Sequence, residues 1–425
     1  MNVDLSFDES QYGFIASLAF TALFATASLL ISPLVDTKSR RYLSAASCLA
    51  WSAALLLQST ATSYSAVVAL RVLTGLACAA TQPSSVTLIN ETFPPSKRAF
   101  AISVYSTAIY TGGALASLSV LLNEQLGWRG TSAVVGWVGV ACAIFGFFFV
   151  KEPREEGGER GGELASSLGA FSDSSSASPS PAPAQLSSSL SPPAAAGTTG
   201  NEKSGIFSDV NVLLSDPTLR LLLLASFIRF CAGLTTGVWS ASYFKAAFPD
   251  DASSYAVINA AIVGGCGIVS NLAGGAIADK ISEAGKSKLL VTAAGSLAAA
   301  PLWYLTMQAS TFETAMAFLA LKYVIAECWF GPTISVLQNS PAVKDGKKGG
   351  LAQGLFTLTG AVSNIAPSLL GFAVSSNFLG DDADASLRLG LLATVTGCYI
   401  VCGALFKIAA DSDERGMMEI DIKRE

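Results

Sequence analysis

The sequence predicts an all-α, polytopic membrane protein built from two pseudo-symmetric helical halves. Hydrophobic residues make up 51% of the chain and charged residues only 13%, so it is more apolar than a water-soluble domain. Apolar runs of about 20 residues, the length that crosses a bilayer as a helix, recur along most of the sequence. A short charged segment between two such runs, residues 31–41, recurs as residues 274–288.

The apolar runs form two sets, five and then six, which gives about eleven transmembrane helices. The first set covers residues 11–34, 42–60, 64–89, 99–122 and 131–150. The second set covers residues 219–244, 254–278, 289–307, 314–337, 350–375 and 387–408. We therefore expect an N-terminal transmembrane half at residues 1–150, a C-terminal half at residues 209–410 and a cytoplasmic tail at residues 411–425.

The segment between the two sets, residues 151–208, has a different composition. It begins with the charged run KEPREEGGER and continues as a low-complexity sequence of Ser, Ala, Pro and Gly. Such a segment cannot bury enough apolar surface to offset the entropy lost on ordering. We expect a disordered cytoplasmic linker that tethers the two halves, with a short interfacial helix at residues 206–214.

The basic residues of the short loops predict the orientation, because Lys and Arg concentrate on the cytoplasmic side of a membrane. The loops predicted as cytoplasmic hold Lys38, Arg40, Arg41, Lys97, Arg98, Lys151, Arg154, Lys280, Lys286, Lys288, Lys344, Lys347 and Lys348. The opposite loops are mainly acidic, and their basic residues are Arg129, Lys245 and Arg388. The amino terminus is therefore expected outside and the carboxyl terminus inside.

The first charged loop reads SPLVDTKSRR at residues 32–41. It resembles the loop pattern G-x-L-a-D-r-x-G-R-R of the major facilitator superfamily of secondary transporters, with serines at the two glycine positions of that pattern. The matching residues of the two copies are Leu34, Asp36, Arg40, Arg41, Gly275, Asp279, Lys280 and Gly285. RVLTG at 71–75, FPPSKRA at 93–99 and GWRG at 127–130 agree as well, and they look most like the spinster-type lipid transporters and the organic anion symporters.

The resemblance also predicts a missing element. The first residues, LSFDESQYGFIAS, look like the outer loop that leads into the second helix of the family. We therefore expect the first family helix to be absent, either through a truncated gene model or in the protein itself.

The repeated loop charges suggest a gate. Asp36 and Asp279 lie near predicted helix ends, with Arg40, Arg41 and Lys286 close by in the sequence. We expect interhelical charge pairs that hold the cytoplasmic face closed and break when it opens. The alternative is a solvated, positively charged inner loop.

Few ionisable residues interrupt the apolar runs. A charge near the bilayer centre costs about 2.5 to 3.5 kcal/mol, so each one needs a partner or a polar cavity. The candidates are Arg71, Arg229, Lys322 and Glu327, which by count fall on the fourth, seventh and tenth helices of the family, those that line its cavity. Three cations and one acid favour an anionic substrate. Alternatively, Arg229 or Lys322 pairs with Glu327 only to lock helices, and Arg71 reaches the interface.

Polar residues at helical spacing extend these faces, and they complete the predicted site. The substrate-binding candidates are Arg71, Gln82, Arg229, Thr236, Lys322, Tyr323, Glu327 and Asn364. Because the sequence has no histidine, proton coupling must use a carboxylate, and Glu327 is the candidate.

The same features exclude other function classes. There is no phosphate-binding loop, which argues against an ATP-driven pump, and the eight cysteines lie in apolar runs without a CxxC pair. We expect no cofactor, no metal, no nucleic-acid partner and no enzymatic activity. The prediction is a monomeric, multi-pass secondary active transporter of a small organic or amphipathic, anionic solute, coupled to a proton or sodium. The alternative is a non-transporting membrane receptor or degenerate relative.

Overall fold

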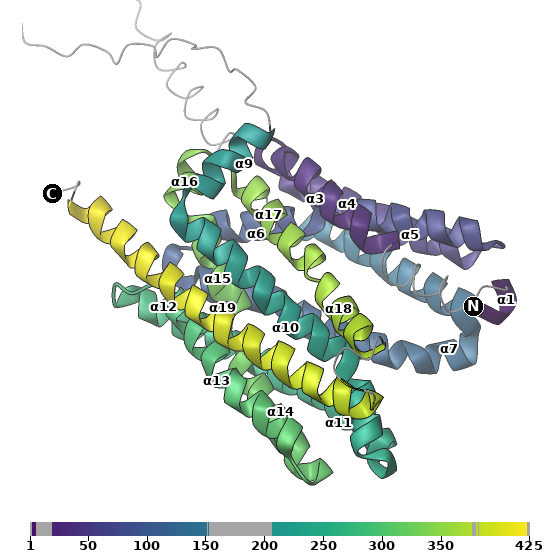
Figure 1. Cartoon of the computed structure of the whole chain (residues 1–425). Helices are drawn as coiled ribbons and strands as arrows, with labels where there is room; N and C mark the ends of the chain where they lie inside the picture. The colour runs from purple at the N-terminus through teal and green to yellow at the C-terminus, as the bar shows by residue number, and fades with distance from the viewer. Residues whose placement is uncertain are drawn as a thin grey trace, which may run out of the picture.

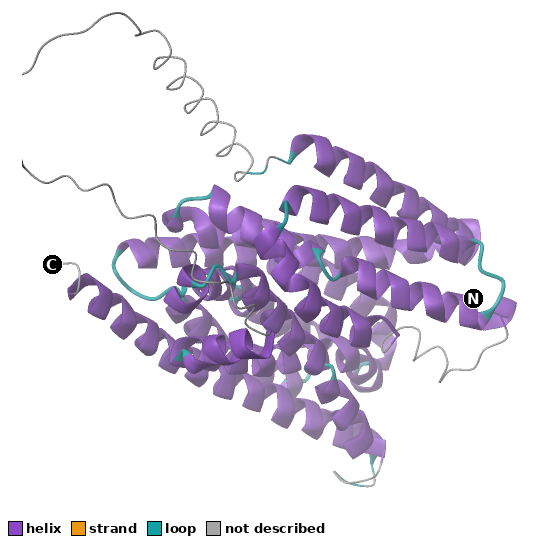
Figure 2. Cartoon of the chain, turned by 90° about the horizontal axis from the view of Figure 1, so that it is seen from above, coloured by secondary structure: helices purple, strands orange, loops and turns teal. Residues whose placement is uncertain are grey.

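The computed structural model describes residues 2–5, 19–150, 152, 206–375, 380 and 382–422. The described residues form helices joined by short loops, and no strand occurs among them (Figure 2). The all-α prediction is confirmed. The predicted linker lies outside the described residues apart from Glu152 and residues 206–208, and so does the start of the first predicted span, residues 11–18.

The helices of the N-terminal half precede the linker. They are α1 (Asn2–Leu5), α3 (Ala19–Thr37), α4 (Arg40–Ser59), α5 (Tyr64–Cys78), α6 (Thr81–Thr92), the 3-10 turn η2 (Pro95–Lys97) and α7 (Arg98–Phe149). α7 bends at Gly127, whose φ of 67° lies in the left-handed region that glycine adopts without strain. The GWRG motif therefore marks the boundary between the two predicted spans within α7.

The C-terminal half follows the linker. Its first elements are α9 (Ile206–Ser215), α10 (Pro217–Ala247), the 3-10 turn η3 (Pro249–Asp251), α11 (Ala252–Ala261), the π-helical turn η4 (Ile262–Cys266) and α12 (Gly267–Glu283). The remaining ones are α13 (Leu289–Gln308), α14 (Phe312–Ala326), α15 (Phe330–Asn339), α16 (Pro341–Asp345), α17 (Gly349–Val362), α18 (Ile365–Ser375) and α19 (Ala383–Ile422). The short helix predicted at 206–214 is present as α9.

Ten helices in the described part of the chain are long and apolar enough to cross a membrane. Each of them overlaps a predicted span. The predicted span at 99–122 lies in the first part of α7, but it is not among the ten. The count of about eleven helices therefore stays a prediction.

Two spans are interrupted at corresponding places. In each half, the interrupted span is the second one after the charged loop. The interruption lies between α5 and α6 in one half and between α14 and α15 in the other. The second break consists of Glu327, Cys328 and Trp329. A helix break inside a membrane leaves backbone groups without intrahelical partners, so it is tolerated where protein or a polar cavity surrounds it.

The two halves meet through paired helices. α3 and α6 pack on α17, and α7 packs on α12 and α15. In Figure 1, α3, α4 and α5 lie on one side of the bundle, and α13, α14 and α19 lie on the other. Two aspartates lie at these contacts, Asp36 beside Gly350 of α17 and Asp279 beside Ala99 of α7. We call the end of the molecule that holds them the Asp36 end; it is the end predicted as cytoplasmic.

Small residues allow this approach. A Cβ atom on Gly275 of α12 would lie 2.8 Å from the carbonyl oxygen of Ala99 on α7. On the other seam, Gly350 and Gly354 of α17 face Ser32 of α3. Ser32 stands where the family pattern has a glycine, and the glycines on the opposite helix leave room for its hydroxymethyl group.

A buried ion-pair cluster braces the N-terminal half. Arg40 is fully buried at the start of α4 and pairs with Glu91 at 2.7 Å and with Glu152, which follows α7. Its neighbour Arg41 donates through Nε to the carbonyl oxygen of Phe147, 2.6 Å away. Both arginines were predicted to form interhelical charge pairs that hold the cytoplasmic face closed. Arg40 does form such pairs, but the contacts of both arginines lie within one half. The reason is that the start of α4 faces the end of α7.

We expect Gly275→Ala to weaken closure at the Asp36 end. The added methyl group meets backbone on α7, and overpacking of this kind costs about 1 to 3 kcal/mol. The reporter is Thr87→Cys on α6, a buried position beside Gly349 of α17. Alkylation of the reporter, read by peptide mass spectrometry, should accelerate about tenfold. Gly237→Ala is the control because nothing lies within 4 Å of its Cβ position; equal rates in both variants would contradict the packing account.

Glu152→Gln should lower the melting temperature in a pH-dependent way. Burial raises the pKa of Glu152, but hydrogen bonds from the Arg40 side chain and backbone outweigh it and hold the pKa below the ordinary 4.5. The stabilisation is therefore present above that ordinary value and is lost as pH falls through the lower, folded-state pKa. The difference in melting temperature between wild type and variant should be constant from about pH 7 to 5 and shrink below about 4.5. The exposed Glu283→Gln is the control, and a pH-independent difference would contradict the ion-pair account.

Candidate functional site

The two repeated aspartates bind helix starts in the opposite half. Asp279 on α12 accepts hydrogen bonds from the backbone N–H groups of Ala99, at 3.3 Å, and Phe100, at 2.9 Å. Asp36 on α3 accepts one from the N–H of Gly350 at 2.7 Å. The first N–H groups of a helix have no intrahelical partner and carry a partial positive charge, so a carboxylate there is favourable. Each half thus caps a helix of the other.

The basic partner of Asp279 is Lys288. Its Nζ lies 2.6 Å from the Asp279 carboxylate and also donates to the carbonyl oxygen of Pro95, 2.8 Å away, and to Ser335 Oγ, 3.2 Å away. The predicted partner, Lys286, is exposed and forms no ion pair in the described part of the chain. The turn after α12 points residue 288 inward and residue 286 outward.

Glu327 is the centre of a charged cluster at the break between α14 and α15. Its Oε1 lies 3.1 Å from Nη2 of Arg229 on α10 and 3.8 Å from Nζ of Lys322 on α14. Its Oε2 accepts a hydrogen bond of 3.1 Å from the hydroxyl of Tyr110 on α7. Arg229 also donates to the carbonyl oxygen of Ala326, the last residue of α14, at 3.0 Å. The carboxylate therefore joins three elements, one of them from the opposite half.

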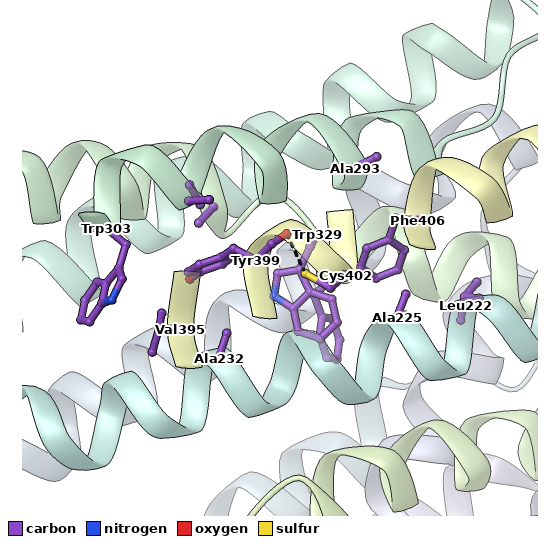
Figure 3. Packing of buried hydrophobic residues seen from close by; sticks show 14 of the residues in the cluster. Leu222, Ala225, Ala232, Ala293, Trp303, Trp329, Val395, Tyr399, Cys402 and Phe406 are labelled. Atoms are coloured by element: carbon purple, nitrogen blue, oxygen red, sulfur yellow. Dashed lines mark hydrogen bonds between the residues drawn. The ribbon is translucent and has the colours of Figure 1, made fainter. Parts of the chain in front are cut away.

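Aromatic rings surround the two cations. The Arg229 guanidinium lies 5.1 Å from the ring centre of Trp329 and 5.0 Å from that of Tyr399. Lys322 Nζ lies 3.9 Å from the ring centre of Tyr323 and within 6 Å of Tyr399 and Trp303. Figure 3 shows Trp303 of α13, Tyr399 of α19 and Trp329 in one buried cluster beside α10. Rings of this kind attract cations more strongly where water is excluded.

The cluster is almost closed to solvent. The side chains of Arg229 and Lys322 are 2% and 1% exposed, and that of Glu327 is 12% exposed. Both cations share the single carboxylate, which is the helix-locking arrangement considered as an alternative above. Arg229 Nε has no hydrogen-bond partner among the described residues, so the guanidinium is not saturated.

The other predicted residues lie elsewhere. Gln82 on α6 accepts a hydrogen bond of 3.2 Å from Thr357 on α17, which joins the halves. Thr236 donates to the carbonyl oxygen of Ala232 in its own helix, and Asn364 donates to Gly360 and Ala361 at the break between α17 and α18. Arg71 is half-buried on α5 and is not one of the two cations paired with Glu327. The structure thus brings together Arg229, Lys322, Tyr323 and Glu327.

Two residues that form hydrogen bonds between the halves, Tyr110 and Asn271, were not identified from the sequence. Tyr110 lies in an apolar run and has no charge that would single it out. Asn271 on α12 is fully buried and donates to the Ser103 carbonyl oxygen at 2.7 Å and to Ser106 Oγ at 2.8 Å on α7. An amide in the middle of an apolar run is costly without a partner, and that signal could have identified it.

The sequence is similar to those of other proteins over most of its length. The chain matches the Major Facilitator Superfamily over residues 1–368. It is 24% identical to the probable L-galactonate transporter of Escherichia coli, covering 95% of this chain and 81% of that protein. It is 25% identical to the probable sulfoacetate transporter of Cupriavidus necator, with 92% and 88% covered. The D-galactonate transporter of Escherichia coli is 30% identical over 105 residues, 24% of each chain.

Solved structures share the fold. The Escherichia coli fucose:proton symporter aligns with a TM-score of 0.62 and 14% identity, covering 94% of this chain and 91% of that one. A human organic anion transporter gives 0.61 and 17%, with 96% and 86% covered. A bacterial homologue of the human lysosomal transporter Spinster gives 0.55 and 17%, with 96% and 89% covered. These likenesses concern the fold. The family match over residues 1–368 shows that this integral membrane protein belongs to the Major Facilitator Superfamily of transporters.

Proposed function

We propose that the protein is a secondary active transporter of a small organic anion, which binds beside Arg229 and Glu327 and crosses by alternating access. The observation that carries this proposal is the position of Glu327. Its carboxylate pairs with two cations of the C-terminal half and accepts a hydrogen bond from Tyr110 of the N-terminal half. A contact of this kind changes whenever the halves move apart.

The charges of the cluster favour an anion. Arg229 and Lys322 carry two positive charges and Glu327 carries one negative charge, so the cluster has a net positive charge. A net charge inside a membrane is costly, and a bound carboxylate or sulfonate would offset one of the positive charges. The free Nε donor of Arg229 can bind such a group.

The names of the relatives agree with this chemistry. L-galactonate, D-galactonate and sulfoacetate are all small organic anions. We extend this class to the present chain because its cluster offers both a guanidinium for the acidic group and nearby polar groups for hydroxyls. Tyr110 and Tyr323 are the nearest of these.

Glu327 would couple transport to a proton. When a proton from the outer solution binds the carboxylate, its attraction for Arg229 falls and the guanidinium becomes free for the substrate anion. The proton and the anion then cross together. Because the charge of the proton offsets that of the anion, the cluster keeps the net positive charge that it had before either was bound. Release of the anion on the inner side restores the pairing of Glu327 with Arg229 and Lys322 after the proton has left.

The two aspartate caps would serve as the inner gate. Opening toward the cytoplasm requires Asp36 to leave Gly350 and Asp279 to leave Ala99 and Phe100. Both caps consist of a carboxylate on helix N–H groups that lack an intrahelical partner, and water can replace the carboxylate once the halves part. The gate is therefore reversible without the burial of an unpaired charge.

The proposal is tested with the purified chain in proteoliposomes. Uptake of labelled galactonate and sulfoacetate should rise when an inward proton gradient is imposed, and galactitol, a neutral analogue, should not be taken up. Arg229→Gln should reduce anion uptake about tenfold or more, because hydrogen bonds to a charged group contribute about 1.5 to 3 kcal/mol. Arg220→Gln, an exposed change of the same kind on the same helix, is the matched control.

Three outcomes would contradict parts of this proposal. Absence of uptake of any solute under any gradient favours the non-transporting relative. Equal uptake of galactitol and galactonate overturns the anion class. Dependence on a sodium gradient with no response to pH assigns the coupling to sodium and removes the role of Glu327.

A further inference from the structure

A cavity lies away from the Glu327 cluster, at the Asp36 end of the C-terminal half. It has a volume of about 710 Å³. Its walls come from the start of α10, the turn between α12 and α13, α15 and α16, and the last turns of α19. The size falls within the range of small-molecule sites, which is about 300 to 1,000 Å³.

The lining of this cavity is basic. It contains Lys286, Lys288, Lys344 and Arg415, against two acids, Asp216 and Asp413. Both acids are engaged in local hydrogen bonds. Asp216 caps α10 through the Thr218 N–H, at 2.8 Å, and accepts from Ser340 Oγ at 2.7 Å. Asp413 accepts from Ser287 Oγ at 2.6 Å.

The basic groups are less well paired. Lys286 and Lys344 form no ion pair in the described ranges, and Arg415 donates through Nε to a carbonyl oxygen of its own helix. Burial lowers the pKa of Lys344, and the positive charges of Arg98 and Lys288 lower it further, with Asp345 opposing them. The cavity therefore holds positive charge that the protein does not neutralise.

We propose that this cavity is a regulatory site for an anion with a phosphate group, supplied either by a lipid headgroup of the inner leaflet or by a free cytosolic molecule. Lys286, Lys344 and Arg415 would contact the phosphate. Ammonium and guanidinium groups form strong, charge-assisted hydrogen bonds with phosphate oxygens. Leu221, Val336 and Met417 supply an apolar wall on which the rest of the ligand rests.

The site is connected to the inner gate through one residue. Lys288 lines the cavity and also binds the carboxylate of Asp279, which caps α7 of the opposite half. A phosphate in the cavity offers Lys288 a second anionic partner and so weakens its hold on Asp279. Ligand binding should therefore favour opening at the Asp36 end.

Binding is measured on the full-length chain in nanodiscs of phosphatidylcholine. The soluble probes are inorganic phosphate and inositol trisphosphate, and the lipid probe is phosphatidylinositol bisphosphate mixed into the nanodisc. The test variants are Lys344→Gln, Arg415→Gln and their combination. Lys280→Gln, an exposed change of the same charge on the same membrane side but outside the cavity, is the control.

The double variant should bind inositol trisphosphate or the lipid at least about tenfold more weakly than wild type, and Lys280→Gln should not differ from wild type. The soluble and lipid arms then identify the source of the ligand. Equal affinities in the double variant and Lys280→Gln would overturn the site, as would no binding of any probe by wild type. If the double variant fails to fold, the single variants decide the same comparison.

The link to the gate has its own readout. The readout is alkylation of the Thr87→Cys reporter, a buried position of α6 beside α17. Its rate should rise when the probe is bound, and the probe should not change the rate in the double variant. An unchanged rate with saturating probe would overturn the coupling. Neither measurement depends on transport, so this inference and the proposed function fail separately.

Discussion

An acid and its two cations, buried together inside a membrane protein, impose the constraint on which the rest of the structure depends. Glu327 can be ionised there only while Arg229 and Lys322 lie within reach, and these cations need the carboxylate in return. The break between α14 and α15 places the Glu327 carboxylate between α10 and α7. Aromatic rings lie over the two cations and help to exclude water from them. Any movement of α7 against the C-terminal half removes Tyr110 from this arrangement and changes the state of the acid.

The contacts at the Asp36 end work on a different principle from the central cluster. Glycines, serines and one buried asparagine let α3 and α7 approach α17 and α12 closely, and the two aspartates close the seams through backbone N–H groups. These interactions are short in range and water can replace them. The centre of the molecule thus holds a net positive charge, and the Asp36 end holds contacts that can separate without leaving a buried charge unpaired. A transporter that alternates between two openings needs both properties.

Much of the architecture followed from hydropathy and loop charges, because both report directly on the bilayer. Most of the spans were accessible in this way, and so were the few charges within them. Arg229, Lys322 and Glu327 were singled out in this way together with Arg71, which the structure places outside their cluster. The directions of side chains were not. Lys288 replaces Lys286 beside Asp279, and Arg40 and Arg41 turn toward α7 and its end, because helix rotation and the path of a short turn depend on packing partners far away in the sequence. Tyr110 could not be foreseen for the same reason, since its role exists only where α7 meets the opposite half.

The central claim is that Glu327 exchanges its cation partners for a proton when an anion binds. Infrared difference spectroscopy of the chain in lipid, recorded with and without galactonate, observes this exchange directly as the carbonyl band of a protonated carboxylic acid. The account predicts that the band appears on addition of the anion and is missing in Glu327→Gln. If wild type shows no such band, or if the variant shows the same one, Glu327 does not take up the proton and the account of coupling is wrong.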